Sequence, residues 1–221
     1  MHTLININKT SPDFLEFFGV LMGDGCIVKF KKPPSDSDYL RIFISGNSKR
    51  DSTYMKNYLN LILKKFQVYA YFYQDKHTNT ITAVINHKKF AEYLVSLGFP
   101  TGKKGQIEIP SWIMALSLEK KFHLIRGLFD TDGCISARKS EEYRRPLVLI
   151  SSESIPLRKQ LKTILREAGL PAYDSSGNVG VDGISSTKKW FELIGSNNPR
   201  NLDRYTGWVR TGALPMLDIK K

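Results

Sequence analysis

Apolar side chains recur at helical spacing in two stretches of the chain, and each stretch ends at an Asp-Gly pair. Spacings of three and four residues are typical of one buried helix face. The apolar positions are Phe14, Phe17, Phe18 and Leu21 in the first stretch and Phe122, Ile125, Leu128 and Phe129 in the second. Ser11 and Ser117 precede these stretches, where an N-cap residue is expected. The pattern predicts two capped amphipathic helices.

Segments typical of β-strands follow each predicted helix in the same order. Their aromatic and branched residues alternate with polar ones, which favours strands. The expected strands are 27–32, 39–45, 68–73 and 80–85, then 135–139, 147–151, 171–174 and 179–184. A helix is expected between the second and third strands of each half, around 59–63 and 161–165, and a further helix begins at Lys88 and at Lys188. The fold class is therefore α+β, with the order αββαββα twice.

The chain repeats itself. Gly-Asp-Gly-Cys-Ile around Asp24 returns as Thr-Asp-Gly-Cys-Ile around Asp132, 108 residues later. We expect two pseudo-symmetric subdomains, 1–105 and 118–221, joined by a linker at 106–117. Small residues four apart allow two helices to cross closely. The expected helix interface consists of Gly19, Gly23, Gly127 and Thr131.

Charge and cysteine content narrow the class of protein. The formal net charge of +12 favours a polyanionic partner, with nucleic acid first. No apolar run approaches the roughly 18 residues of a membrane helix, and the first residues do not resemble a secretion signal. Cys26 and Cys134 lack the spacing of a zinc site or a disulfide framework. We expect an intracellular protein, in the cytoplasm or nucleoid of a prokaryote or in an organelle matrix.

Asp24 and Asp132 are the candidate reactive groups. If the two helices cross at their small residues, both carboxylates arrive beside one pseudo-twofold axis. Two adjacent carboxylates repel, and a divalent cation relieves the conflict. An all-oxygen site without His or Cys suits Mg²⁺. Asp-Gly is also a common turn pair, but its recurrence at the end of two capped helices favours a metal site.

The sequences FFGVLMGDG, ending at Gly25, and IRGLFDTDG, ending at Gly133, resemble the two motifs of single-chain LAGLIDADG homing endonucleases. The resemblance covers nearly the whole chain, because the strands and helices after each motif also fit. It implies a monomer that needs no protein partner and binds double-stranded DNA, with two β-sheets forming a saddle. The expected activity is a double-strand break in a long, non-palindromic target, leaving short 3′ overhangs.

The same resemblance assigns roles to residues. Asp24 and Asp132 would be catalytic and would hold Mg²⁺, or Mn²⁺ or Ca²⁺ in its place, with help from the carbonyls of Gly23 and Thr131. Lys103 or Lys104 would act on water or the scissile phosphate, with a counterpart among Arg200 and Arg204. The chain departs from some relatives, which have Gln or Lys where it has Ser45-Gly46 and Ser151-Ser152. This departure leaves the groups around the attacking water open.

Period-two alternation in the strands leaves one sheet face free to meet DNA, where Arg and Lys can read guanine or grip phosphate. The candidate DNA-binding residues are Lys29, Lys31, Arg41, Tyr69, Tyr71, Tyr73, Arg138, Lys139, Arg144, Arg145, Arg200 and Arg204.

Two other functions stay open: an intron RNA maturase, and a DNA-binding protein of the same fold that does not cut. Both tend to lose an acid, whereas this chain has two, which favours the nuclease. An intein is disfavoured, because the chain has no Cys or Ser at position 1 and no His-Asn at its end.

Overall fold

A computed structural model describes residues 7–32, 35–137 and 144–215, so the DNA-binding candidates Arg138 and Lys139 lie outside the described residues. The helices are α1 (Pro12–Asp24), η1 (a π-helix, Tyr54–Leu59), α2 (Asn60–Lys65), α3 (Lys88–Ser96), α4 (Ser111–Met114), α5 (Leu118–Asp132), α6 (Ile155–Glu167), α7 (Ile184–Leu193) and α8 (Pro199–Thr211). The strands are β1 (Gly25–Lys32), β2 (Ser35–Asn47), β3 (Ala70–Asp75), β4 (Thr80–Ile85), β5 (Gly133–Ala137), β6 (Pro146–Ser151), β7 (Tyr173–Ser175) and β8 (Asn178–Asp182).

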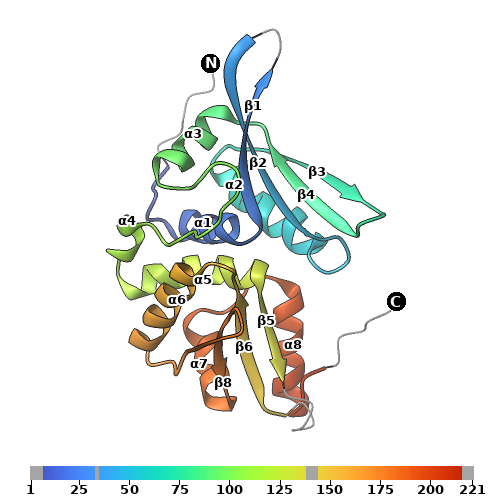
Figure 1. The fold of residues 1–221 in the computed structure, drawn as a ribbon. Coiled ribbons are helices and arrows are strands. Elements are labelled where there is room, and N and C mark those ends of the chain that lie inside the picture. Colours follow the sequence, from blue (N-terminus) through green and yellow to red (C-terminus); the bar gives the residue numbers. More distant parts are fainter. Residues whose placement is uncertain (1–6, 33–34, 138–143, 216–221) are drawn as a thin grey trace.

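The two halves lie on either side of a seam formed by α1 and α5 (Figure 1). Each half contains a four-stranded antiparallel sheet, with strand order β1-β2-β4-β3 in the first and β5-β6-β8-β7 in the second. Even the registers correspond, because Gly25 pairs with Ile44 and Gly133 pairs with Ile150. The α+β class and the internal repeat are thereby confirmed.

Both motif helices begin directly after the serine residues that were expected to precede them. The Ser11 hydroxyl accepts a hydrogen bond from the Phe14 backbone N–H at 3.3 Å and so caps α1. Ser117 stands at the same place before α5, but its side chain makes no capping hydrogen bond. Buried side chains from both helices belong to one apolar cluster that extends through both halves. None of the described helices has the length and apolar character needed to cross a membrane.

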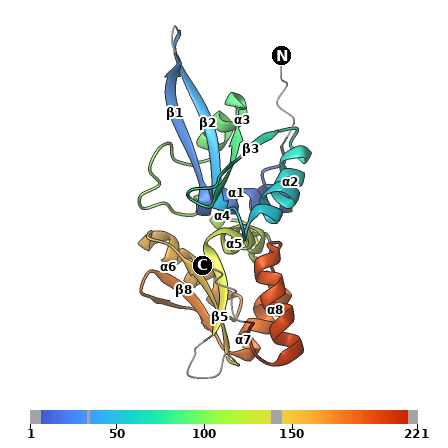
Figure 2. The same cartoon turned by 90° about the vertical axis from the view of Figure 1, so that its right-hand side faces the viewer.

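The second half departs from the expected boundaries most clearly where β8 is followed by α7. The helix predicted to begin at Lys188 begins at Ile184, because Gly183 turns the chain with a φ of 102° directly after β8. The strand predicted to run to residue 184 therefore ends at Asp182. A further helix, α8, follows α7 and stands beside β5 (Figure 2).

The segment before the linker covers the free edge of β1. Thr101 forms a parallel bridge with Ile27, and the Gly102 N–H donates to the Ile27 carbonyl oxygen at 2.8 Å. Covering an edge strand satisfies backbone groups that would otherwise be open to pairing with another chain.

The next residues contact the other half. The side chain of Gln106 accepts a hydrogen bond from the Ile155 N–H at 3.0 Å, and Gln160 of α6 bonds both backbone groups of Ile109, at 2.7 and 3.2 Å. The chain thus passes from one half to the other around Gly105, where an added β-carbon would meet none of the described atoms within 4 Å.

Candidate active site

The two motif helices touch through their glycines. A β-carbon on Gly19 would collide with the Leu124 carbonyl oxygen of α5, and one on Gly127 would collide with the Glu16 carbonyl oxygen of α1. The contact is therefore reciprocal and leaves no room for a side chain at either position. Such close approach of two backbones is what small residues four apart permit.

This crossing brings the ends of α1 and α5 together. A β-carbon on Gly23 would collide with the Thr131 hydroxyl and lie 3.1 Å from the Asp132 carboxylate. Asp24 in turn lines a narrow cavity of about 10 Å³ together with Thr131. Each acid therefore lies beside the residue that precedes the other acid, as a twofold arrangement requires.

Burial raises the pKa of both acids, and the charge of Asp132 adds to the shift at Asp24. Burial, together with the charges of Asp132 and Asp51, raises the pKa of Asp24 to about 7, against the lowering effect of Lys104 and Arg200. Burial also raises the pKa of Asp132, while Lys104 and Arg200 lower it. A divalent cation bound beside the two carboxylates would oppose this shift, because it favours their ionised form.

The donor set at the helix ends fits a hard divalent cation. The carboxylates of Asp24 and Asp132 and the carbonyls of Gly23 and Thr131 are all oxygen ligands, which Mg²⁺ prefers. Among the residues described here, no three His, Cys, Asp or Glu side chains are grouped to hold a metal ion. Carbonyl, water or phosphate oxygens would have to complete the coordination.

Of the two candidate lysines, Lys104 is the one at the helix end. Its ammonium group donates to the Met22 carbonyl oxygen at 2.9 Å and to that of Gly23. Burial lowers the pKa of Lys104, whereas the charges of Asp132 and Asp24 raise it. Lys103 is exposed. The segment that covers β1 therefore brings one cation to the end of α1, where its charge acts on both acids.

Arg200 occupies the corresponding place in the second half. Its Nη2 lies 3.1 Å from the Gly133 carbonyl oxygen and 3.4 Å from that of Thr131, on either side of Asp132. Arg204, one helical turn later, donates through Nε to the Ile135 carbonyl oxygen at 2.9 Å. Helix α8 thus binds the free edge of β5 through two arginines and brings one of them to the second acid.

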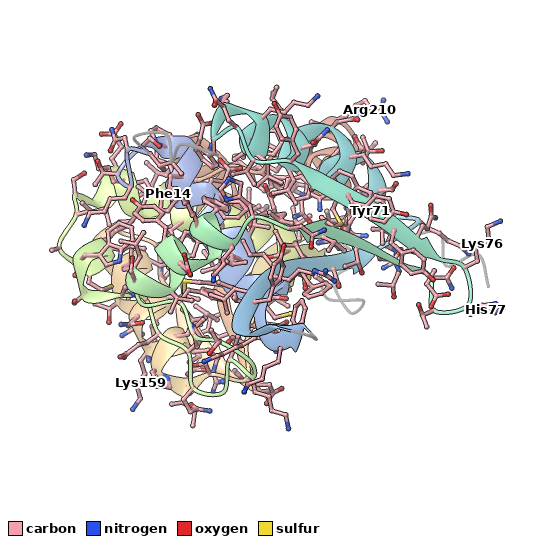
Figure 3. All side chains as sticks on the ribbon, turned by 90° about the horizontal axis from the view of Figure 1, so that it is seen from above. Phe14, Tyr71, Lys76, His77, Lys159 and Arg210 are labelled. Carbon is pink, nitrogen blue, oxygen red and sulfur yellow. The ribbon has the colours of Figure 1, made fainter. Side chains whose placement is uncertain are left out.

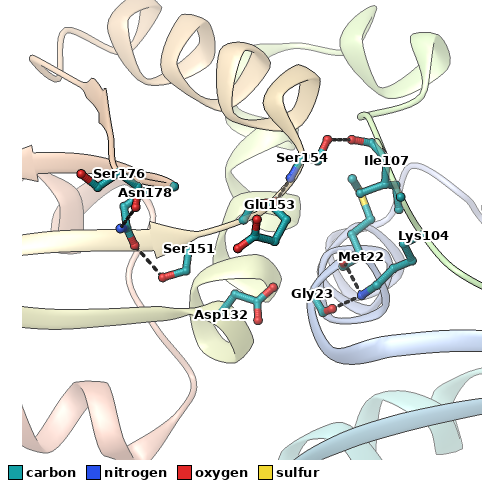
Figure 4. Close-up of a pocket in the computed structure, with 13 residues that line it drawn as sticks. Met22, Gly23, Lys104, Ile107, Asp132, Ser151, Glu153, Ser154, Ser176 and Asn178 are labelled. Atoms are coloured by element: carbon teal, nitrogen blue, oxygen red, sulfur yellow. Dashed lines mark hydrogen bonds between the residues drawn. The ribbon is translucent and has the colours of Figure 1, made fainter.

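A cavity of about 620 Å³ opens beside these groups (Figure 4). Gly23 and Lys104 line one side, and Asp132 projects from the other. The polar side chains that complete the lining come from the second half: Ser151, Ser152, Glu153, Ser154, Ser176 and Asn178. Ser151 and Ser152, at positions where some relatives have Gln or Lys, therefore contribute hydroxyl groups to the lining of the candidate site.

Comparison with known proteins supports the resemblance to LAGLIDADG proteins. Residues 119–197 match the family model of the LAGLIDADG-like domain. The second half of the chain is therefore similar to a LAGLIDADG-like domain. A search of curated protein sequences found no match.

Solved structures extend the likeness over both halves. The homing endonuclease I-DmoI, solved with DNA and manganese, matches with a TM-score of 0.59 at 15% identity, over 84% of this chain and 97% of that one. The LAGLIDADG meganuclease I-AabMI, solved with uncleaved DNA, matches with a TM-score of 0.52 at 11% identity, over 90% of both chains. At these identities the likeness establishes the LAGLIDADG homing endonuclease fold, as the two motifs predicted.

On the first sheet, the register divides the candidate DNA-binding residues between two faces. Arg41 pairs with Val28, and its guanidinium lies 5.0 Å from the centre of the Phe30 ring. Tyr71 (labelled in Figure 3) pairs with Val84, which pairs with Phe43, two residues after Arg41, so Tyr71 lies on the face of Arg41. Tyr69 and Tyr73 are two residues away on either side and belong to the same face. All three tyrosines are exposed.

Lys29 pairs with Leu40 and so lies on the opposite face, with Lys31 two residues further along the strand. That face carries the buried Ile27 and packs on the helices. Sequence alternation indicated a basic DNA surface, whereas the register gives the outer face Arg41 and aromatic side chains.

The described candidates of the second sheet lie at its borders. Arg145 forms an ion pair with Asp182 at 3.1 Å, and the Arg144 carbonyl accepts a hydrogen bond from Trp208 at 3.1 Å. Arg200 and Arg204 hold the edge of β5, as described above.

Sequence reasoning missed a buried polar network behind the two acids. Asp130 accepts hydrogen bonds from the Ser196 hydroxyl and from the Asn197 N–H, and burial raises its pKa to about 7. The Asn197 side chain also donates to Glu16 of α1 at 2.7 Å. The turn between α7 and α8 therefore connects both motif helices. Nothing local in the sequence signals these contacts, because the partners come from opposite ends of the chain.

Proposed function

We propose that this protein is a site-specific homing endonuclease that makes a double-strand break in DNA by metal-dependent phosphodiester hydrolysis. The observation that carries the proposal is the pairing of Asp24 and Asp132 at the ends of two crossed helices, each beside the residue that precedes the other. The fold, shared with endonucleases solved on DNA, supports the same activity.

Each part of the site has a role in the proposed reaction. Asp24 and Asp132, with the carbonyls of Gly23 and Thr131, would hold divalent cations. Mg²⁺ bound there would neutralise phosphate charge and lower the pKa of an attacking water. Lys104 and Arg200 place positive charge beside the acids, where they can bind the phosphates of the two strands.

The arrangement also suggests what the target is like. Both acids come from one chain, so a single molecule would cut both strands. The two sheets differ in length and surface, and we therefore propose a long, non-palindromic target with one half-site for each sheet. The family resemblance further implies that the cuts would leave short 3′ overhangs.

Cleavage of a labelled duplex tests the proposal. The substrate is the DNA obtained by joining the two flanks of the open reading frame, incubated with the protein and Mg²⁺, Mn²⁺, Ca²⁺ or EDTA. The nuclease function is supported if the wild type cuts in Mg²⁺ or Mn²⁺ and if Asp24→Asn and Asp132→Asn each abolish cutting of at least one strand. Unchanged cutting by both variants would defeat the assigned mechanism.

A further inference from the structure

A carboxylate of the first half lies against the cation of the second half. Asp51 belongs to the segment between β2 and η1, and only 11% of its side chain is exposed. Its Oδ1 lies 3.2 Å from Nη1 of Arg200 and accepts a hydrogen bond from the Asn198 side chain at 3.0 Å. Its Oδ2 accepts from the Asn47 N–H at 2.9 Å. Both carboxylate oxygens are thus fixed by neighbours from two halves of the chain.

The guanidinium of Arg200 connects this carboxylate to the second acid. While Nη1 faces Asp51, Nη2 faces the carbonyl oxygens of Gly133 and Thr131. The Nε atom is buried and has no hydrogen-bond partner among the described residues. The orientation of the planar group is therefore set by contacts at its two Nη atoms, and one of these contacts is Asp51.

Asn198 couples the start of α8 to the same carboxylate. Its side-chain oxygen accepts from the Arg200 N–H at 3.0 Å and so caps the helix. Its side-chain nitrogen donates to Asp51 and, at 2.8 Å, to the Asp130 carbonyl oxygen. This fully buried side chain therefore fixes the position of the backbone at Arg200, while Asp51 fixes the position of the guanidinium.

The first acid has a different arrangement. Lys104 reaches the carbonyls of Met22 and Gly23, and the acids whose charges act on it are Asp132 and Asp24 themselves. Arg200 also acts on both acids, but it has in addition an ion pair with a third carboxylate, Asp51, supplied across the seam. The two cations are thus held by different means, although they occupy corresponding places.

We propose that Asp51 is a positioning residue for the second active site: it orients Arg200 beside Asp132, so that cutting of one DNA strand depends on a carboxylate from the other half of the protein. This inference rests on the proposed nuclease function for its effect on cutting, but the contact can be tested apart from it.

Strand-resolved cleavage tests the catalytic consequence. Each strand of the target duplex carries a different 5′ label, and Arg200→Gln identifies the strand that depends on Arg200. Asp51→Asn, which keeps the size of the side chain, is expected to slow cutting of that strand roughly ten- to a hundredfold and to leave a nicked product. Asp174→Asn is the matched control, because it removes an ion pair with Arg158 at 2.9 Å within the second half. Equal slowing of both strands, or no slowing, would overturn the proposal.

A double variant separates positioning from general destabilisation. In an Asp51→Asn background, adding Arg200→Gln is expected to slow the same strand much less than Arg200→Gln does alone. Fully additive losses would show that the two residues act independently, and would count against the inference.

Side-chain NMR of arginine-labelled protein provides a readout without DNA. In the wild type, the two Nη atoms of Arg200 have different partners and should give separate NMR signals. Asp51→Asn should merge the two signals, whereas Asp174→Asn should leave them separate. If the wild type cuts DNA but Asp51→Asn leaves these signals unchanged, the inference fails and the function stands. If the signals merge but the wild type cuts no DNA, the contact stands and the proposed function fails.

Discussion

The ammonium group of Lys104 donates a hydrogen bond to the carbonyl oxygen of Gly23, the residue before Asp24. This contact places a positive charge at the end of α1, where the carboxylates that act on it are the two candidate acids. Lysine and acid are 80 residues apart, and the segment that covers β1 brings them together.

Lys104→Met should slow cutting of one strand roughly a hundredfold, as loss of one stabilising donor does in other active sites. The strand affected should be the one that Arg200→Gln spares. Lys103→Met is the matched control, since it removes the same charge one residue earlier from an exposed side chain. Equal losses in both variants, measured on the labelled duplex, would mean that general surface charge and not position is responsible.

Gly127→Ala should destabilise the protein by about 2 kcal/mol, because the new methyl group meets the Glu16 carbonyl oxygen. In an isolated helix the same change would be stabilising by about 1 kcal/mol, so the sign of the effect is diagnostic. Urea unfolding measures it. Gly19→Ala should behave alike, whereas Lys120→Ala on the exposed surface of α5 should change little. A more stable Gly127→Ala variant would refute the close crossing.

Asp24→Asn should make the metal-free protein more stable at pH 8. Because the pKa of Asp24 is raised from 3.8 to about 7 on folding, the folded state binds this proton more tightly than the unfolded state. The free energy of unfolding of the wild type therefore falls as the pH rises from about 4 to about 7.

The amide avoids this loss, and we expect a gain on the order of 2 kcal/mol at pH 8 that vanishes near pH 4. Urea unfolding in EDTA across this range measures the difference. Asp174→Asn, which removes an ion-paired carboxylate, should show no such gain. An Asp24→Asn variant less stable than the wild type at pH 8 would contradict the assigned environment.

Tyr71→Ala should weaken binding of the target duplex about tenfold, because an exposed aromatic side chain on the outer face of the first sheet would lose its contact with DNA. Fluorescence anisotropy in Ca²⁺ measures the affinity. Lys31→Ala should have the smaller effect, since the register turns this residue to the same face as Leu40. The reverse order would place DNA on the other face of β1.

Local patterns predicted much of the fold. The apolar spacing, the serine caps and the repeated Asp-Gly located both motif helices, and strand β4 was predicted at its observed bounds. Helix α8 was missed although its signals are present: Asn198-Pro199 is a typical helix start, and Gly212 ends the helix with a φ of 76°. The internal repeat does not predict this helix, because the described part of the first half has no matching helix.

The candidate site was less accessible from the sequence. Asp24 and Asp132 carry a motif that can be read locally, and their neighbour Lys104 was one of two lysines left open. No local pattern singles out Asp51, because its partner Arg200 lies 149 residues away and no spacing rule connects them. Such contacts depend on how the two halves pack, which is determined by the whole core.

The passage of the chain from the first half to the second at Gly105 has a practical consequence for protein engineering. Residues up to Lys104 serve β1 and the first acid, whereas Gln106 already binds α6. A hybrid enzyme that borrows its first half from another protein should therefore be joined at this glycine. A junction several residues earlier would combine β1 and the first acid of the other protein with the covering segment and Lys104 of this one, so that neither the strand edge nor the cation would meet the partner it evolved with.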